Sequence, residues 1–287
     1  MMSLLAFGLI LISACMHATW NYLAKRSKGG TAFVWLYMVV SAIIYAPFVI
    51  VVLIYQEMNI GWPEIGMILA SAAIHLAYSL TLQKGYKVGD FSLIYPIARG
   101  TGPMLVAISA IFIFDERLTP LGIMGIALIV ISVFVITGGL HIFKTSASLL
   151  PVTYGLLVGI IIAGYTLLDK GAVGVFLIPP LLLNYGGIIG QIIVLTPFAS
   201  RDWSEVRKEW NHHRKEAIGV GLLNPLAYIL ILTAMVFTPV SHVAPVRELS
   251  ILFGAIMGTV LLSEGFGKRR IIAACIMVVG IVAVALS

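Results

Sequence analysis

SLLAFGLILISACMHATWNYLAKRSK, residues 3–28, is an apolar run that ends in a group of basic side chains. About 20 apolar residues is the length that an α-helix needs to cross the hydrocarbon core of a bilayer. Runs of this kind recur along the whole chain, at 3–23, 31–55, 62–82, 89–114, 118–138, 150–168, 178–198, 216–237, 240–262 and 269–286. The sequence therefore predicts an all-α polytopic membrane protein with ten transmembrane helices.

The composition excludes a soluble domain of this length. Hydrophobic residues make up 60% of the 287, charged residues only 10%, and the mean hydropathy is +1.06. The isoelectric point near 9.3 reflects basic loops and gives no reason to expect nucleic-acid binding. Cys15 and Cys275 both fall within apolar runs, so we expect free thiols and no disulfide.

The basic residues lie in alternate connections between the apolar runs. Fourteen of the eighteen follow an odd-numbered run: Lys25, Arg26, Lys28, Lys84, Lys87, Lys144, Arg201, Arg207, Lys208, Arg214, Lys215, Lys268, Arg269 and Arg270. Only Arg117 and Lys170 lie in the other connections. Because short loops rich in Lys and Arg stay in the cytoplasm, we expect a plasma (bacterial inner) membrane protein with both termini outside the cytoplasm.

The two halves of the chain share an order of features about 145–149 residues apart. Residues 20–25 correspond to 165–170, and 92–96 correspond to 241–245. Five runs per half is an odd number, so the second half must enter the membrane in the opposite orientation. We therefore expect two inverted five-helix repeats, 1–140 and 150–287, with a substrate site near the midplane between them.

With these features the chain resembles the ten-span EamA-type members of the drug/metabolite transporter superfamily. The resemblance covers nearly the whole chain and rests on the five-plus-five layout and on short local motifs. The motifs are Trp20-Asn21 near the end of the first run, Pro96 in the fourth, Asp115-Glu116-Arg117-Leu118 at its close and Ser263-Glu264-Gly265 at the close of the ninth. The resemblance implies transport of a small metabolite.

A local match points to one branch of that family, and one feature departs from it. His17-Ala18-Thr19-Trp20-Asn21, followed by Lys25, looks like a subgroup linked to phosphonate utilisation. Typical members carry their basic residues as if both termini were inside, whereas here the bias is reversed. Either the protein is inverted in the membrane, which the charge distribution favours, or the number of spans differs by one.

Two arginines, Arg99 and Arg247, fall inside the fourth and ninth runs. An arginine at mid-membrane costs about 2.5–3.5 kcal/mol on insertion scales. Each follows a proline, Pro96 or Pro245, that leaves a backbone carbonyl unsatisfied nearby. One interpretation is that both arginines hold an anionic group of a substrate. The other is that Arg247 forms a structural ion pair with Glu248 or another carboxylate.

Other polar side chains recur at helical spacing, as expected for the wall of a cavity. The expected substrate-binding residues, besides the two arginines, are Trp20, Asn21, His75, Tyr78, Tyr95, Tyr165, Asn224 and Tyr228. Asp169 and Lys170, at a predicted span end, are assigned to a solvated mouth. The second, fifth and tenth runs are nearly devoid of polar residues, so we expect them to face lipid or, in a homodimer, a second subunit.

Four residues are candidates for proton coupling: Glu248, His75, His17 and His242. A histidine changes charge near physiological pH, and Glu248 is the acidic residue placed well inside a predicted span. The alternative is that each histidine makes an interhelical hydrogen bond.

The connection after the seventh run is long and charged. Trp203, Val206 and Trp210 share one face of a helix there, so we expect an amphipathic segment on the cytoplasmic membrane surface. The adjacent His212-His213 lacks a third ligand, and no metal site is expected. Small-residue spacings at 155/159, 186/190 and 254/258 predict close helix packing.

No phosphate-binding loop or hydrolase motif is present, so no cofactor and no enzymatic activity is expected. We expect a gradient-driven secondary transporter of a small anionic or zwitterionic metabolite that works by alternating access. One alternative is a flippase for an anionic lipid-linked substrate, and another is an intramembrane enzyme acting on lipid phosphate.

Overall fold

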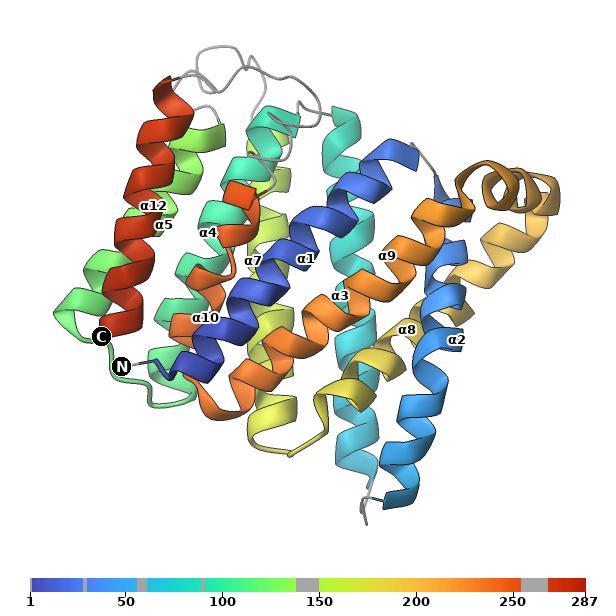
Figure 1. The fold of residues 1–287 in the computed structure, drawn as a ribbon, viewed down its shortest axis with the longest axis horizontal. Helices are drawn as coiled ribbons and strands as arrows, with labels where there is room; N and C mark the ends of the chain where they lie inside the picture. Colours follow the sequence, from blue (N-terminus) through green and yellow to red (C-terminus); the bar gives the residue numbers. More distant parts are fainter. Residues whose placement is uncertain (1, 28–29, 56–60, 89–90, 138–149, 254–267) are drawn as a thin grey trace.

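The computed structural model describes residues 2–27, 30–55, 61–88, 91–137, 150–253 and 268–287, and they form a bundle of α-helices (Figure 1). The helices are α1 (Leu4–Ser27), α2 (Thr31–Tyr55), α3 (Trp62–Val88), α4 (Phe91–Ile113), α5 (Pro120–Thr137), α7 (Leu150–Gly174), α8 (Pro180–Ala199), α9 (Trp203–Phe237), α10 (Val240–Val246) and α12 (Lys268–Leu286). The 3₁₀ turn η1 (Ser200–Asp202) joins α8 to α9. The described residues contain no strand, and the all-α prediction is confirmed.

The helices have the length and surface of membrane-spanning helices. Within the described residues five helical stretches are long and apolar enough to cross a bilayer: Leu4–Ala24, Thr31–Tyr55, Trp62–Leu82, Leu150–Gly174 and Pro180–Phe237, the last covering α8 and α9 together. Shorter apolar helices cover Ile97–Ile113, Pro120–Val133 and Ile272–Leu286. Large apolar side chains such as Phe112 and Ile54 point outward, with 83% and 70% of their surface exposed. The chain is an integral membrane protein; the number of spans stays a prediction.

Helices from opposite ends of the sequence pack against each other (Figure 1). The C-terminal α12 lies along α5, and α1 lies along α9, while α7 contacts both α3 and α4. Both chain ends meet at one end of the bundle, where the Met2 amide donates to the Ala285 carbonyl at 3.0 Å. The bundle is thus closed by contacts between the first and the second half of the chain.

Glycines allow several of these helices to approach closely. A Cβ on Gly159 of α7 would lie 2.7 Å from the Thr101 Cβ of α4, and one on Gly155 would lie 2.9 Å from that of Ile97. On α8, Cβ atoms on Gly186 and Gly190 would press against α3 in the same way. Close packing at these two spacings is therefore confirmed; the third, at 254/258, lies outside the described residues.

The predicted surface segment forms the first turns of α9, which bends at His213 (φ −125°, ψ 25°) before entering the bundle. The expectation that Val206 faces the membrane is wrong, because Val206 is buried against Leu36 of α2. Trp203 stacks edge-on against Trp35 at 5.5 Å, and Trp210 is exposed. The apolar face of the segment thus anchors α9 to α2 and only partly reaches outward.

We expect Gly159→Ala to destabilise the protein because the added methyl group forces α7 away from α4. Overpacking of this kind costs about 1–3 kcal/mol. The matched control is Gly164→Ala on the same helix, where a Cβ meets nothing within 4 Å. Thermal unfolding in detergent should show a lower midpoint for Gly159→Ala and an unchanged or higher one for Gly164→Ala. Equal midpoints would contradict the close α4–α7 contact.

Candidate functional site

The predicted ninth span is interrupted where its charged residues lie. Helix α10 ends at Val246, and Arg247 and Glu248 form a turn before the chain becomes helical again. Pro245 supplies no amide hydrogen, and the amides of Glu248 and Ile251 bond three residues back, not four. The tightened backbone places two consecutive charged side chains in the bundle interior, with Arg247 4% exposed and Glu248 fully buried.

Arg99 on α4 is the closest cationic partner of Glu248. Its Nη1 donates to both carboxylate oxygens at 3.1 Å, and the two residues are 149 positions apart in the chain. The Nε of Arg247 lies farther away, 3.9 Å from Oε1 of Glu248. The ion pair between Arg247 and Glu248 is therefore present but long, and the closer pair, Arg99–Glu248, joins the two halves of the chain.

The guanidinium of Arg247 is left with unused donors. Among the described residues, neither Nε nor Nη2 has a hydrogen-bond partner, and both atoms are buried. A buried charged donor without an acceptor is costly, by about 1–3 kcal/mol or more. A bound anion would satisfy these donors directly.

A second carboxylate belongs to the same region. Asp169 on α7 is fully buried and accepts a hydrogen bond from the Tyr228 hydroxyl of α9. Nε2 of His75, near the middle of α3, lies 3.9 Å from its Oδ2. The prediction that Asp169 sits in a solvated mouth is wrong. The predicted sixth span ends at residue 168, whereas α7 continues to Gly174 and carries Asp169 inside the bundle.

Aromatic rings cover this carboxylate. The His75 ring lies 4.2 Å from that of Tyr165 and 5.5 Å from that of Tyr228, measured between centroids. Tyr78 packs edge-on against Tyr165 at 5.8 Å. The structure thus brings together four residues predicted for substrate binding, contributed by α3, α7 and α9.

His17 and Trp20 form another part of the polar interior. The Trp20 indole donates to Nδ1 of His17 at 2.9 Å, and the buried Nε2 of His17 makes no hydrogen bond within the described part of the chain. The charges of Arg99 and Arg247 both act on His17. That of Arg247 also acts on Asp169 and on Tyr228. We call the interacting set the central cluster: His17, His75, Arg99, Asp169, Tyr228, Arg247 and Glu248.

Other predicted residues lie outside this cluster or at its edge. Asn21 is exposed and donates to the backbone carbonyl of its own helix at His17. His242 is near the chain ends, where Nε2 contacts the Ser287 hydroxyl at 2.9 Å. Asn224 is half-buried on α9, one turn before Tyr228. Tyr95 lies on α4, but its side chain is outside the described residues.

Lys170 also differs from its assignment to a solvated mouth. Its ammonium donates to the Met235 carbonyl at 2.5 Å and to the Thr238 carbonyl at 3.2 Å. These carbonyls are at the C-terminal end of α9, where a cation compensates the exposed acceptors of the helix. Lys170 therefore caps α9 and turns away from the carboxylate of the preceding residue.

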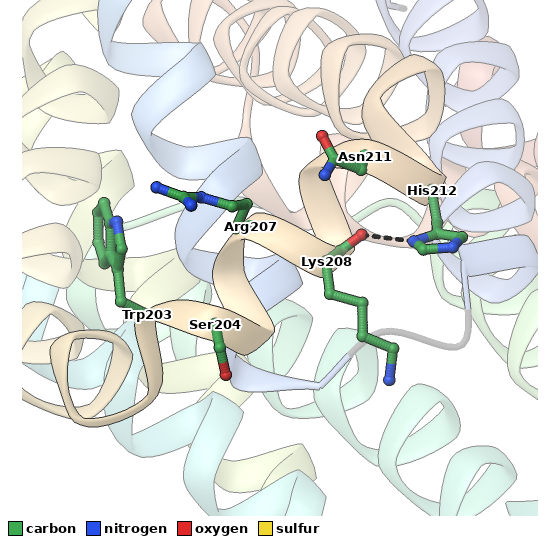
Figure 2. A pocket seen from close by; sticks show the side chains of 6 residues that line it. All are labelled: Trp203, Ser204, Arg207, Lys208, Asn211 and His212. Carbon is green, nitrogen blue, oxygen red and sulfur yellow. Dashed lines mark hydrogen bonds between the residues drawn. The ribbon is translucent and has the colours of Figure 1, made fainter.

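A hollow of about 460 Å³ lies on the surface segment at the start of α9 (Figure 2). Its lining residues are Trp203, Ser204, Arg207, Lys208, Asn211 and His212. His212 donates from Nδ1 to the Lys208 carbonyl at 2.8 Å, which holds its ring along the helix (Figure 2). These side chains are solvent-exposed and share none of the central cluster's residues, so the hollow is a feature of the loop surface.

Comparisons with known proteins agree with this architecture. Residues 149–286 match the model of the EamA-like transporter family. Twenty-nine chains of solved structures are similar to this one. One, described only as a crystal structure of a protein, matches with a TM-score of 0.74 over 99% of this chain and 97% of its own. At 14% identity it shares the fold alone. No curated protein matches the sequence.

We expect Arg99→Gln to destabilise the protein because it leaves Glu248 buried without its closest cationic partner. Removing one member of a buried ion pair typically costs about 3–5 kcal/mol. The double variant Arg99→Gln/Glu248→Gln buries no uncompensated charge, so it should recover part of the loss. Thermal unfolding of the wild type, both single variants and the double variant gives the coupling energy. Strictly additive effects would show that the two side chains do not interact.

Proposed function

We propose, from the membership of residues 149–286 in the EamA-like transporter family, that this chain is a gradient-driven secondary transporter of a small anionic or zwitterionic metabolite. The family belongs to the drug/metabolite transporter superfamily, whose members move small solutes across membranes. The substrate binds at the central cluster, in the interior of the bundle. Members of this family are transporters, and we assign the central cluster to the binding of a substrate.

The observation that carries the proposal is the buried guanidinium of Arg247, whose Nε and Nη2 have no hydrogen-bond partner among the described residues. Arg247 lies in the break of an interrupted helix, and interrupted helices form the substrate sites of many transporters. Its free Nε and Nη2 donors match the geometry of a carboxylate or phosphonate, which accepts two parallel hydrogen bonds. Neighbouring rings, among them Tyr165 and Trp20, provide apolar surface for the remainder of a small organic molecule.

The Arg99–Glu248 pair supplies a way to link binding to movement. Arg99 belongs to the first predicted repeat and Glu248 to the second, so the pair joins the halves that alternating access must separate. A substrate anion bound to Arg247 lies beside the Glu248 carboxylate of this pair, so its charge acts on the contact between the halves.

The packing of the helices supports two inverted repeats. If the first five spans correspond in order to the last five, α1 corresponds to α7, α2 to α8 and α3 to α9. The contact α1–α9 is then equivalent to α7–α3, and the contact α2–α9 to α8–α3. All four contacts occur, and two further contacts, α2–α8 and α5–α12, map onto themselves, whereas the α4–α7 contact has no strong counterpart between α1 and α10 in the described residues. Both chain ends lie at the same end of the bundle, as expected when the chain crosses the membrane an even number of times (Figure 1). We propose ten spans with both termini outside the cytoplasm.

We expect a substrate anion to stabilise the purified protein and the effect to depend on Arg247. A ligand at one hundred times its dissociation constant adds about 2.7 kcal/mol. The panel comprises methylphosphonate, glycerol 3-phosphate, glutamate, a quaternary ammonium cation and an anionic lipid, with thermal unfolding in detergent as the measurement. Stabilisation by one of the three soluble anions should vanish in Arg247→Gln.

The matched control is Arg207→Gln, the same substitution at an exposed arginine of the surface segment, which should respond like the wild type. Stabilisation by the cation alone contradicts an anion site. Stabilisation by the lipid alone favours a flippase over a transporter of soluble metabolites.

We expect a cysteine at position 3 to be labelled from outside intact cells and one at position 211 to be protected. Both Ser3 and Asn211 are exposed, so accessibility depends only on the side of the membrane. The variants Ser3→Cys and Asn211→Cys are made after replacing the two free cysteines, Cys15 and Cys275, by alanine. A membrane-impermeant maleimide should react at position 3, and at position 211 only after lysis. The reverse pattern would mean that the protein has the opposite orientation.

A further inference from the structure

We propose that the Asp169 carboxylate binds a proton that travels with the substrate anion, so that the protein is an anion–proton symporter. The proposal rests on the anion transport inferred above and adds the coupling ion and the residue that carries it. Among the candidates for coupling from sequence, Glu248 is committed to Arg99 and His242 lies near the chain ends. Asp169 is a further buried carboxylate and has no cationic partner of that strength.

The position of Asp169 fits a proton carrier. It is fully buried, its Oδ2 accepts from the Tyr228 hydroxyl, and its Oδ1 has no hydrogen-bond partner within the described residues. The closest basic nitrogen, Nε2 of His75, is 3.9 Å from Oδ2, beyond a hydrogen bond. One oxygen is therefore open to a proton while the other is held in place.

The helices that pack on α7 differ in the titratable and charged groups that they carry. α3 contributes Ser71 and His75, α9 contributes Tyr228, and the turn after α10 contributes the charge of Arg247. α4 contributes Arg99, which is bound to Glu248. On α8 no residue is charged, and Tyr185 is its titratable side chain. On α7 itself Tyr165 stacks on His75, and Lys170 is bound to carbonyls of α9.

Charge balance gives the stoichiometry. The cluster holds two arginines, Arg99 and Arg247, and two carboxylates, Glu248 and Asp169, so the formal charges of these four groups cancel in the empty site. A bound monoanion leaves one negative charge buried in the membrane, where an uncompensated charge is costly. One proton on Asp169 restores neutrality, and the loaded site then has the same net charge as the empty one.

The same argument fixes the direction of coupling. An anion near the cluster favours protonation of Asp169, and a protonated Asp169 favours the anion, because binding linkage is reciprocal. Proton and anion therefore bind together and cross together, which is symport. In the balanced step one proton enters from water on one side, converts the carboxylate to a carboxylic acid, and leaves to water on the other side with the anion.

The test uses the full chain reconstituted in liposomes with ¹⁴C-labelled methylphosphonate, glycerol 3-phosphate and glutamate as parallel probes. An imposed gradient of one pH unit, acidic outside, should make the wild type accumulate a monoanionic probe up to about tenfold. A pH dye inside the vesicles should report proton entry that starts when the anion is added. Asp169→Glu, which keeps a carboxylate, should still accumulate the probe.

Asp169→Asn should lose accumulation and anion-dependent proton entry, while movement down the probe's own gradient persists at a changed rate. Asp202→Asn is the matched control, because Asp202 is an exposed cap of α9 and asparagine caps equally well. It should accumulate like the wild type.

The outcomes separate the two proposals. If the wild type moves none of the probes and none of them stabilises it, both the anion transport and the coupling are overturned. If it moves a probe but ignores the pH gradient, or exchanges it against protons, only the coupling is overturned. If the wild type accumulates a probe and Asp169→Asn does so equally, another residue carries the proton.

Discussion

A guanidinium group cannot remain uncompensated inside an apolar bundle, and this constraint organises the interior of the protein. Arg99 is neutralised by Glu248, which lies in the other half of the chain, and the contact therefore fixes how the halves meet. Arg247 is buried beside the same carboxylate, and within the described part of the chain its Nε and Nη2 have no hydrogen-bond partner. The apolar helices could pack in several registers, whereas charge compensation is satisfied in few. The buried ions thus select an arrangement that hydrophobicity alone leaves open.

Much of the fold follows from the sequence because spans are set by length and hydropathy. Predicted run 31–55 coincides with α2, and most other runs differ from their helices by a few residues. The error at Asp169 has the same origin. A hydropathy pattern ends a span at the first charged residue, but a helix continues for as long as its backbone hydrogen bonds continue. Inside the bundle, the Asp169 carboxylate finds a hydrogen-bond donor in Tyr228.

Pairing between distant residues could not be predicted from the sequence. The adjacency of Arg247 and Glu248 predicted a local pair, which forms at 3.9 Å. The closer pair, from Glu248 to Arg99 at 3.1 Å, joins residues 149 positions apart and has no local signal in the sequence. Similarly, Trp20 and Asn21 are neighbours in sequence, but Trp20 donates to the His17 side chain, whereas Asn21 is exposed and donates to the His17 backbone carbonyl. Which residue of a motif faces inward depends on helix rotation, and that is set by packing.

The meeting of the chain ends has a consequence for how the protein could be built. Met2 bonds to Ala285, and Ser287 touches His242, so a short link could join the two termini within the fold. The contacts among the described helices are made by residues outside the stretch between Thr137 and Leu150, where the chain could be opened. The order of the two halves in the gene is therefore not dictated by their packing, and two separate polypeptides could assemble into the same bundle.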